Sequence, residues 1–130
     1  MNTLRNEILA CADGPARRGE DGDEYELTYR FGADFMAFSG HFPGHPILPA
    51  FVQLLAGECA IQSRAERNMV LLHVKRAKFL KPIEPGQEIT IRWRERPLDH
   101  GVRGSFTLLV DDEKAASFTL EMAAGEGSDV

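Results

Sequence analysis

The sequence has no apolar run of about 18 residues, so no segment of it predicts a membrane-spanning helix. Cysteine is scarce: Cys11 and Cys59 form no CxxC pair and no disulfide framework, and we interpret them as reduced thiols. The first 24 residues lack a long apolar stretch, which argues against a secretory signal. The chain has a net charge of -5 at pH 7, so it lacks the excess of basic residues that is typical of nucleic-acid-binding proteins. These absences predict a cytoplasmic protein with no membrane span and no nucleic-acid partner.

What is present is ordinary for a globular protein. Hydrophobic residues make up 43% of the chain and charged residues 27%, and no internal repeat is visible. A length of 130 residues is enough to bury one core but leaves no room for a second. We therefore expect a single domain over residues 1–130, with residues 13–24 as a solvated loop.

Hydrophobic periodicity predicts a strand and then a helix. Residues 24–31 alternate, which is typical of a half-buried strand with one apolar face made of Tyr25, Leu27, Tyr29 and Phe31. From Pro49 to about Arg67 the apolar residues cover most of a helical circumference, which indicates a buried helix. Pro49 suits the first turn of that helix, and Asn68 is a reasonable left-handed stop.

Strands follow the helix without another helical pattern. They are predicted at residues 69–80, 88–96, 101–110 and 114–123, with a proline- and glycine-rich turn before the second and the hairpin signal "DDE" before the last. We expect an α+β fold in which an antiparallel sheet wraps around one long central helix. The exposed edges of such a sheet favour pairing with a second copy of the chain.

The segment "SGHFPGHPILPAFVQLLAGECA", residues 39–60, contains the residues best suited to chemistry. Its recurrent prolines hold the chain extended and place His41 near the start of the predicted helix. Free N–H groups there could polarise a carbonyl, and His41 could act as a general base, although a lone histidine on a loop is more often structural or a surface residue. His41 and His45 are four residues apart, but the intervening prolines exclude the helix that a metal pair would need, so no metal site is predicted.

The run "FSGHFPGHPILPAFVQL" resembles the signature of the 3-hydroxyacyl-[acyl carrier protein] dehydratases of the hot-dog fold. The residues from Gly40 to Gly44 and from Pro46 to Pro49 match that signature in order, and "RAKFLKPIEPGQEITI" is similar to the family's later strand and turn. The resemblance runs from about Tyr25 to the last strand. The short N-terminal part is more similar to the short dehydratase-like proteins found with aryl-polyene and other specialised acyl-chain pathways.

The resemblance implies a homodimer or a higher even oligomer in which two sheets join and the active sites form at the interface. It implies that His41 removes the α-proton of a 3-hydroxyacyl thioester carried on acyl carrier protein or coenzyme A. The N–H of Ala50 would polarise the thioester carbonyl, and Gly40, Phe42 and Pro49 would help to bind substrate. An acid on the central helix of the other subunit would protonate the leaving hydroxyl, and no cofactor would be needed.

Two positions depart from the family pattern. Ala50 replaces the usual glycine; its N–H is intact, but its methyl group could crowd the substrate. Leu55 occupies the position of the family's acid, and leucine has no proton to give. The carboxylate in the buried part of the helix is Glu58, three residues further on. Glu58 could be a relocated catalytic acid or a water-activating base, a structural carboxylate paired with an arginine or Gln62, or a residue facing solvent.

Three functions remain open from the sequence. The first is dehydration by His41 with Glu58 or a water as the acid, the second is thioester hydrolysis with Glu58 activating water, and the third is non-catalytic acyl binding or service as a partner subunit. A locally basic stretch also suits docking to an acidic carrier protein, or the ordinary polar faces of strands. It comprises Lys75, Arg76, Lys78, Lys81, Arg92, Arg94 and Arg96.

Overall fold

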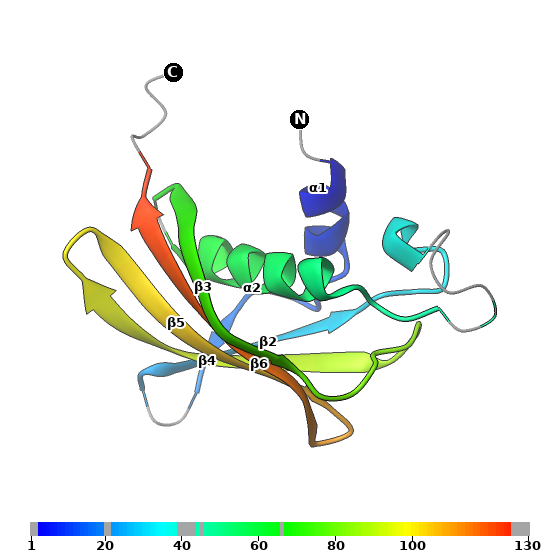
Figure 1. Cartoon of the computed structure of the whole chain (residues 1–130). Coiled ribbons are helices and arrows are strands. Elements are labelled where there is room, and N and C mark those ends of the chain that lie inside the picture. The colour runs from blue at the N-terminus through cyan, green and yellow to red at the C-terminus, as the bar shows by residue number, and fades with distance from the viewer. Residues whose placement is uncertain (1–2, 20–21, 39–43, 45, 66, 126–130) are drawn as a thin grey trace.

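A computed structural model describes residues 3–19, 22–38, 44, 46–65 and 67–125. The elements follow in the order α1 (Thr3–Ala10), β1 (Arg17–Arg18), β2 (Glu24–Arg30), the 3-10 turn η1 (Met36–Phe38), α2 (Ala50–Arg64), β3 (Met69–Phe79), β4 (Glu88–Leu98), β5 (Gly101–Val110) and β6 (Glu113–Ala124). The strands form a six-stranded sheet in the order β1-β2-β4-β5-β6-β3, and every neighbouring pair is antiparallel. The sheet curves around α2 (Figure 1), which confirms the predicted α+β architecture.

The core lies between α2 and the concave face of the sheet. Leu27, Tyr29 and Phe31 are each at most 2% exposed, so the alternation predicted for the first strand is confirmed. A row of stacked rings crosses four strands on this face, with centroid separations of 5.3 to 5.6 Å, and it consists of Tyr25, Trp93, Phe106 and Phe118. Gly57 brings α2 close to that row, because a Cβ there would lie 2.8 Å from Cε1 of Phe118.

The sequence also predicted the last hairpin correctly. Val110 pairs with Glu113, so the turn between β5 and β6 consists of Asp111 and Asp112. Both residues have a positive φ, 53° and 64°, as a two-residue turn that follows the twist of the strands requires. Aspartate tolerates this conformation better than most side chains.

Several boundaries differ from the predictions. The helix ends at Arg64 rather than near Arg67, and the capping residue Ala65 is extended with φ -79° and ψ 140°. Asn68 is not in the left-handed region, and its carbonyl accepts a hydrogen bond from the N–H of Gly125, the residue that follows β6. The segment predicted as a solvated loop contains β1, which pairs with β2, and the unpredicted helix α1 packs against α2.

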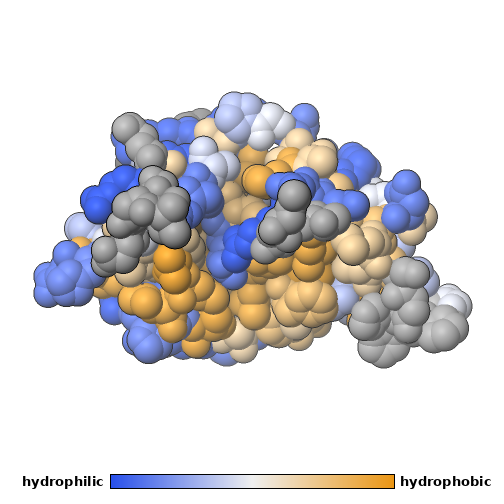
Figure 2. Space-filling view, turned by 90° about the horizontal axis from the view of Figure 1, so that it is seen from above, coloured by the Kyte–Doolittle hydropathy of each residue, from blue (hydrophilic) through white to orange (hydrophobic). Residues whose placement is uncertain are grey.

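The edge strand β3 carries an exposed apolar row. Figure 2 shows hydrophobic side chains gathered in a broad band along one side of the face seen from above. The large apolar side chains left exposed on β3 and just beyond it are Val70, Leu72, Val74, Phe79 and Leu80. Phe51, at the start of α2, is 54% exposed, so the predicted burial of the helix is not complete. Among the described residues, no helix is long and apolar enough to cross a membrane.

Candidate functional site

The segment leading into α2 is fixed to the body of the protein at Leu48. The backbone N–H of Leu48 donates to the carbonyl of Ile83 at 2.8 Å, and Nε2 of Gln53 donates to the carbonyl of Leu48 at 3.2 Å. Gln53 is 4% exposed, and within the described part of the chain its Oε1 is buried without a hydrogen-bond partner. Sequence reasoning missed Gln53; its one signal was a polar side chain among the apolar residues of the helix.

The first turn of α2 presents unused donors. The N–H groups of Val52 and Gln53 both bond to the carbonyl of Pro49. Among the described residues, the N–H groups of Ala50 and Phe51 have no acceptor, as expected at a helix start. Ala50 is exposed and Pro49 is half-buried, and the helix start carries the partial positive charge of the helix N-terminus.

Three predicted site residues lie outside the described residues. They are Gly40, His41 and Phe42. The neighbouring Pro43 and His45 also lie outside the described residues. His41 remains the predicted base on the strength of its sequence motif.

Glu58 forms an ion pair with the N-terminal helix. Arg5 on α1 donates through Nη2 to Oε1 of Glu58 at 2.8 Å, and Glu58 is 8% exposed. Burial lowers the pKa of Arg5, but the hydrogen bond and the charge of Glu58 outweigh it and raise the pKa above its ordinary value. Of the three arrangements left open by the sequence, the ion pair with an arginine is the one observed. Whether Glu58 also acts on a substrate stays a prediction.

Arg5 was not foreseen, because it belongs to the eight-residue helix α1, whose pattern is too short to stand out. The pair lies in a hollow of about 550 Å³, also lined by Gln62, Asn68, Met69, Val70 and Leu71. Leu55, at the position of the expected acid, is half-buried and packs against the core.

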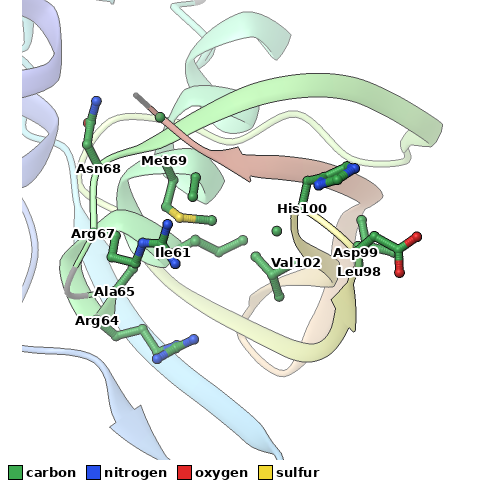
Figure 3. Close-up of a pocket in the computed structure, with 13 residues that line it drawn as sticks. Ile61, Arg64, Ala65, Arg67, Asn68, Met69, Leu98, Asp99, His100 and Val102 are labelled. Atoms are coloured by element: carbon green, nitrogen blue, oxygen red, sulfur yellow. The ribbon is translucent and has the colours of Figure 1, made fainter. Parts of the chain in front are cut away.

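A further hollow lies at the C-terminal end of α2, away from the helix start (Figure 3). It has a volume of about 1190 Å³, and residues of the end of α2 and of the turn between β4 and β5 line it, including Ile61, Arg64, Met69, His100 and Val102. Of the predicted site residues that the structure describes, Pro49, Ala50 and Glu58 do not line this hollow. Among the described residues, no group of three or more His, Cys, Asp or Glu side chains could hold a metal ion.

The predicted basic stretch does not form one surface. Two strands, β5 and β6, separate the lysines of β3 from the arginines of β4. Four of the seven cations are paired with carboxylates: Lys75 with Glu121, Lys81 with Glu113, Arg92 with Glu26, and Arg94 with Asp23 and Glu24. Of the two interpretations of this stretch, a docking surface is thus reduced to separate, partly neutralised groups.

Comparison with known proteins finds sequence relatives of the chain that are described as dehydratases. The family model described as ApeI dehydratase, ApeI-like, matches residues 17–119. The chain is 34% identical over 91 residues to the 3-hydroxyacyl-[acyl-carrier-protein] dehydratase FabZ of Wolbachia sp. subsp. Drosophila simulans, covering 64% of each. It is 32% identical over 99 residues to FabZ of Campylobacter hominis, covering 65% of this chain and 66% of the relative. The match therefore spans just under two thirds of the length of these relatives.

Solved structures share the fold at low identity. The dehydratase heterocomplex ApeI:P from Xenorhabdus doucetiae matches with a TM-score of 0.66 and 20% identity, covering 86% of this chain and 93% of that one. A hypothetical thioesterase with coenzyme A from Streptococcus pneumoniae matches with a TM-score of 0.65 and 10% identity, covering 95% of both chains. These likenesses confirm the hot-dog fold predicted from the sequence.

Proposed function

Because this chain belongs to the ApeI-like dehydratase family, we propose that it removes water from a 3-hydroxyacyl thioester carried on acyl carrier protein or coenzyme A. The observation that carries the proposal is the match of residues 17–119 to that family, which includes the whole GHFPG motif and α2. The unused N–H groups at the start of α2 support it, because they suit a carbonyl on which negative charge develops.

The proposed reaction uses the residues around the helix start. The N–H of Ala50 donates to the thioester oxygen, and His41 takes the proton from the α-carbon. The electron pair of that C–H bond becomes the new C=C bond as the C–O bond to the 3-hydroxyl breaks. The hydroxyl leaves as water after accepting a proton from an acid. Gly40, Phe42 and Pro49 shape the substrate channel beside these two residues.

The identity of the acid is the open chemical step, and we assign it to Glu58 or to a water molecule. Oε1 of Glu58 already accepts a hydrogen bond from Arg5, so a proton for the leaving group would have to come from the other carboxyl oxygen. The hollow that contains this pair is also lined by Val70 and Leu71 of the edge strand, so it would adjoin a subunit paired along that edge.

The proposed assembly is a homodimer joined at β3. An edge strand presents unpaired backbone groups, and β3 adds the exposed apolar side chains of Leu72 and Val74. Pairing two copies along this edge would bury those side chains.

A second candidate function follows from Leu55. A homodimer of this chain has leucine at both acid positions, whereas a different hot-dog subunit could contribute a carboxylate. The structural likeness to a protein described as a heterocomplex supports considering this arrangement. In that case the chain supplies His41 and the acyl-binding surface, and its partner supplies the acid.

The testing experiment is dehydration of a 3-hydroxyacyl thioester on carrier protein, comparing the wild type with His41→Ala and Glu58→Gln. We expect His41→Ala to lower the rate by roughly 10²- to 10⁴-fold. The exposed residues His73 and Glu84 provide matched controls, His73→Ala and Glu84→Gln. Full activity in His41→Ala would rule out the assigned base. Full activity in Glu58→Gln would limit Glu58 to its ion pair, and release of free thiol would indicate a thioesterase instead.

A further inference from the structure

The edge strand β3 contains a bulge with a strained residue. Lys75 pairs with Thr119 and Lys78 pairs with Ser117, so Arg76 and Ala77 both stand opposite Phe118 of β6. Arg76 has a φ of 54°, a left-handed conformation that a residue with a Cβ adopts only at a cost in free energy. Bulges of this kind redirect side chains and are frequent next to functional sites.

The bulge borders a hollow of about 370 Å³. The hollow is lined by Arg76, Ala77, Lys78, Phe106, Ser117, Phe118 and Thr119. Phe118 packs toward Gly57 of α2, on the inner face. Side chains alternate along a strand, so the hydroxyls of Ser117 and Thr119 point to the opposite face, as does Lys78, which pairs with Ser117.

Two cations at this hollow are not neutralised. Arg76 and Lys78 are exposed, and among the described residues neither lies within ion-pair distance of a carboxylate. Glu121, the acid on the same face, is held by Arg103 at 2.8 Å and by Lys75 at 3.3 Å. The hydrogen bond from Arg103, followed by that from Lys75, lowers the pKa of Glu121. The negative charge of Glu121 is therefore compensated by these two cations and not by Arg76 or Lys78.

From this geometry we infer that the bulge of β3 forms a phosphate-binding site, in which Arg76 and Lys78 supply charge and Ser117 and Thr119 supply hydroxyl donors. A guanidinium, an ammonium and two hydroxyls match the oxygens of a phosphate group. The phosphate could be free, or it could be the phosphodiester of the pantetheine arm that carries an acyl thioester. The second source rests on the proposed function, whereas the site itself does not.

The direct test is a titration of the full chain with inorganic phosphate, followed through the NMR shifts of the Ala77 and Ser117 backbone amides. We expect saturable shifts in the wild type that disappear in the double variant Arg76→Gly, Lys78→Gln. Glycine suits the positive φ at position 76, so this variant should keep the bulge and the fold. The matched control Arg96→Gly, Lys114→Gln removes the same charges from exposed positions outside the hollow and should keep the shifts. Absence of saturable shifts in the wild type overturns the site, whatever the enzyme assay shows.

A second measurement separates the two sources of phosphate. The value of kcat/KM is compared for a 3-hydroxyacyl thioester of phosphopantetheine and for that of pantetheine, which lacks the phosphate. If the site holds the carrier arm, the wild type should prefer the phosphorylated thioester by roughly tenfold, and the double variant should lose that preference. If the preference is equal in both proteins while the NMR shifts persist, the site binds phosphate from another source. A protein inactive on both thioesters contradicts the proposed function and leaves the titration to decide on the site.

Discussion

Nη2 of Arg5 lies 2.8 Å from Oε1 of Glu58, and this ion pair joins α1 to the central helix α2. It ties a short N-terminal helix to the middle of the helix around which the sheet is folded. The pair also determines what Glu58 can do, because a carboxylate oxygen that accepts from a guanidinium is not a proton donor.

Removing Arg5 should destabilise the fold, because it leaves the carboxylate of Glu58 mostly buried without its partner. We expect Arg5→Ala to lower the free energy of unfolding by about 1–2 kcal/mol, a value reduced because the Arg5 side chain is 38% exposed. Urea denaturation measures the change. Arg67→Ala, at an exposed arginine, is the control. In a double-mutant cycle with Glu58→Gln, a coupling energy near zero would show that the pair does not stabilise the protein.

Gly57 should tolerate no side chain. A Cβ there would lie 2.8 Å from Cε1 of Phe118 and 3.2 Å from Cδ1 of Leu120, so α2 would have to move away from the sheet. We expect Gly57→Ala to lower the free energy of unfolding by about 1–2 kcal/mol, although alanine favours a helix by up to about 1 kcal/mol. Thermal or urea denaturation checks it. The control is Ser63→Ala, at an exposed position of the same helix. A Gly57→Ala variant more stable than the wild type would contradict the packing described for α2.

Glu121 should make stability depend on pH. Its pKa is lowered in the folded protein, first by the hydrogen bond from Arg103 and then by Lys75. Its contribution is therefore present above the unfolded-state pKa of about 4.3 and is lost as the pH falls through the lower folded-state value. We expect Glu121→Gln to be less stable than the wild type at pH 7 and the difference to shrink toward pH 3. Urea denaturation at both pH values tests this, with Glu84→Gln as the control; a constant difference would refute it.

The fold was largely predictable from residues close together in the chain, and the ion pairs and bulges were not. The alternation around Leu27 and Tyr29 and the apolar run after Pro49 predicted a sheet wrapped on a helix. The pairing of Arg5 with Glu58 joins residues 53 positions apart, and no local pattern reports it. The bulge at Arg76 likewise depends on how β3 meets β6. Motif matching predicted His41 and Ala50, but the acid could not be predicted, because Leu55 breaks the pattern.

Charges placed on β3 should prevent the proposed homodimer. Leu72 is 52% exposed and Val74 is 39% exposed, and burial of both against a partner would favour association. We expect the wild type to be a dimer and Leu72→Asp, Val74→Asp to be a monomer in analytical ultracentrifugation. Leu9→Asp, which changes a similarly exposed leucine on α1, should remain a dimer. A monomeric wild type would refute the homodimer and favour a different partner subunit.

Leu55→Glu should reveal whether the missing acid limits the chain. The substitution places a carboxyl group at the position where the resemblance expects one, and general-acid assistance typically contributes at least about 10²-fold to a rate. We expect dehydration of a 3-hydroxyacyl thioester to rise by roughly that factor over the wild type. Two controls should not raise the rate of dehydration. Leu55→Gln introduces a side chain with the shape of glutamate but no ionisable proton, and Leu54→Glu places the carboxyl group one position away on the helix. A rise in Leu55→Glu alone would mean that His41 and Ala50 are already competent and that the homodimer lacks only the acid. An active wild type that Leu55→Glu does not improve would mean that the proton already has another source, and Glu58→Gln would then show whether that source is Glu58.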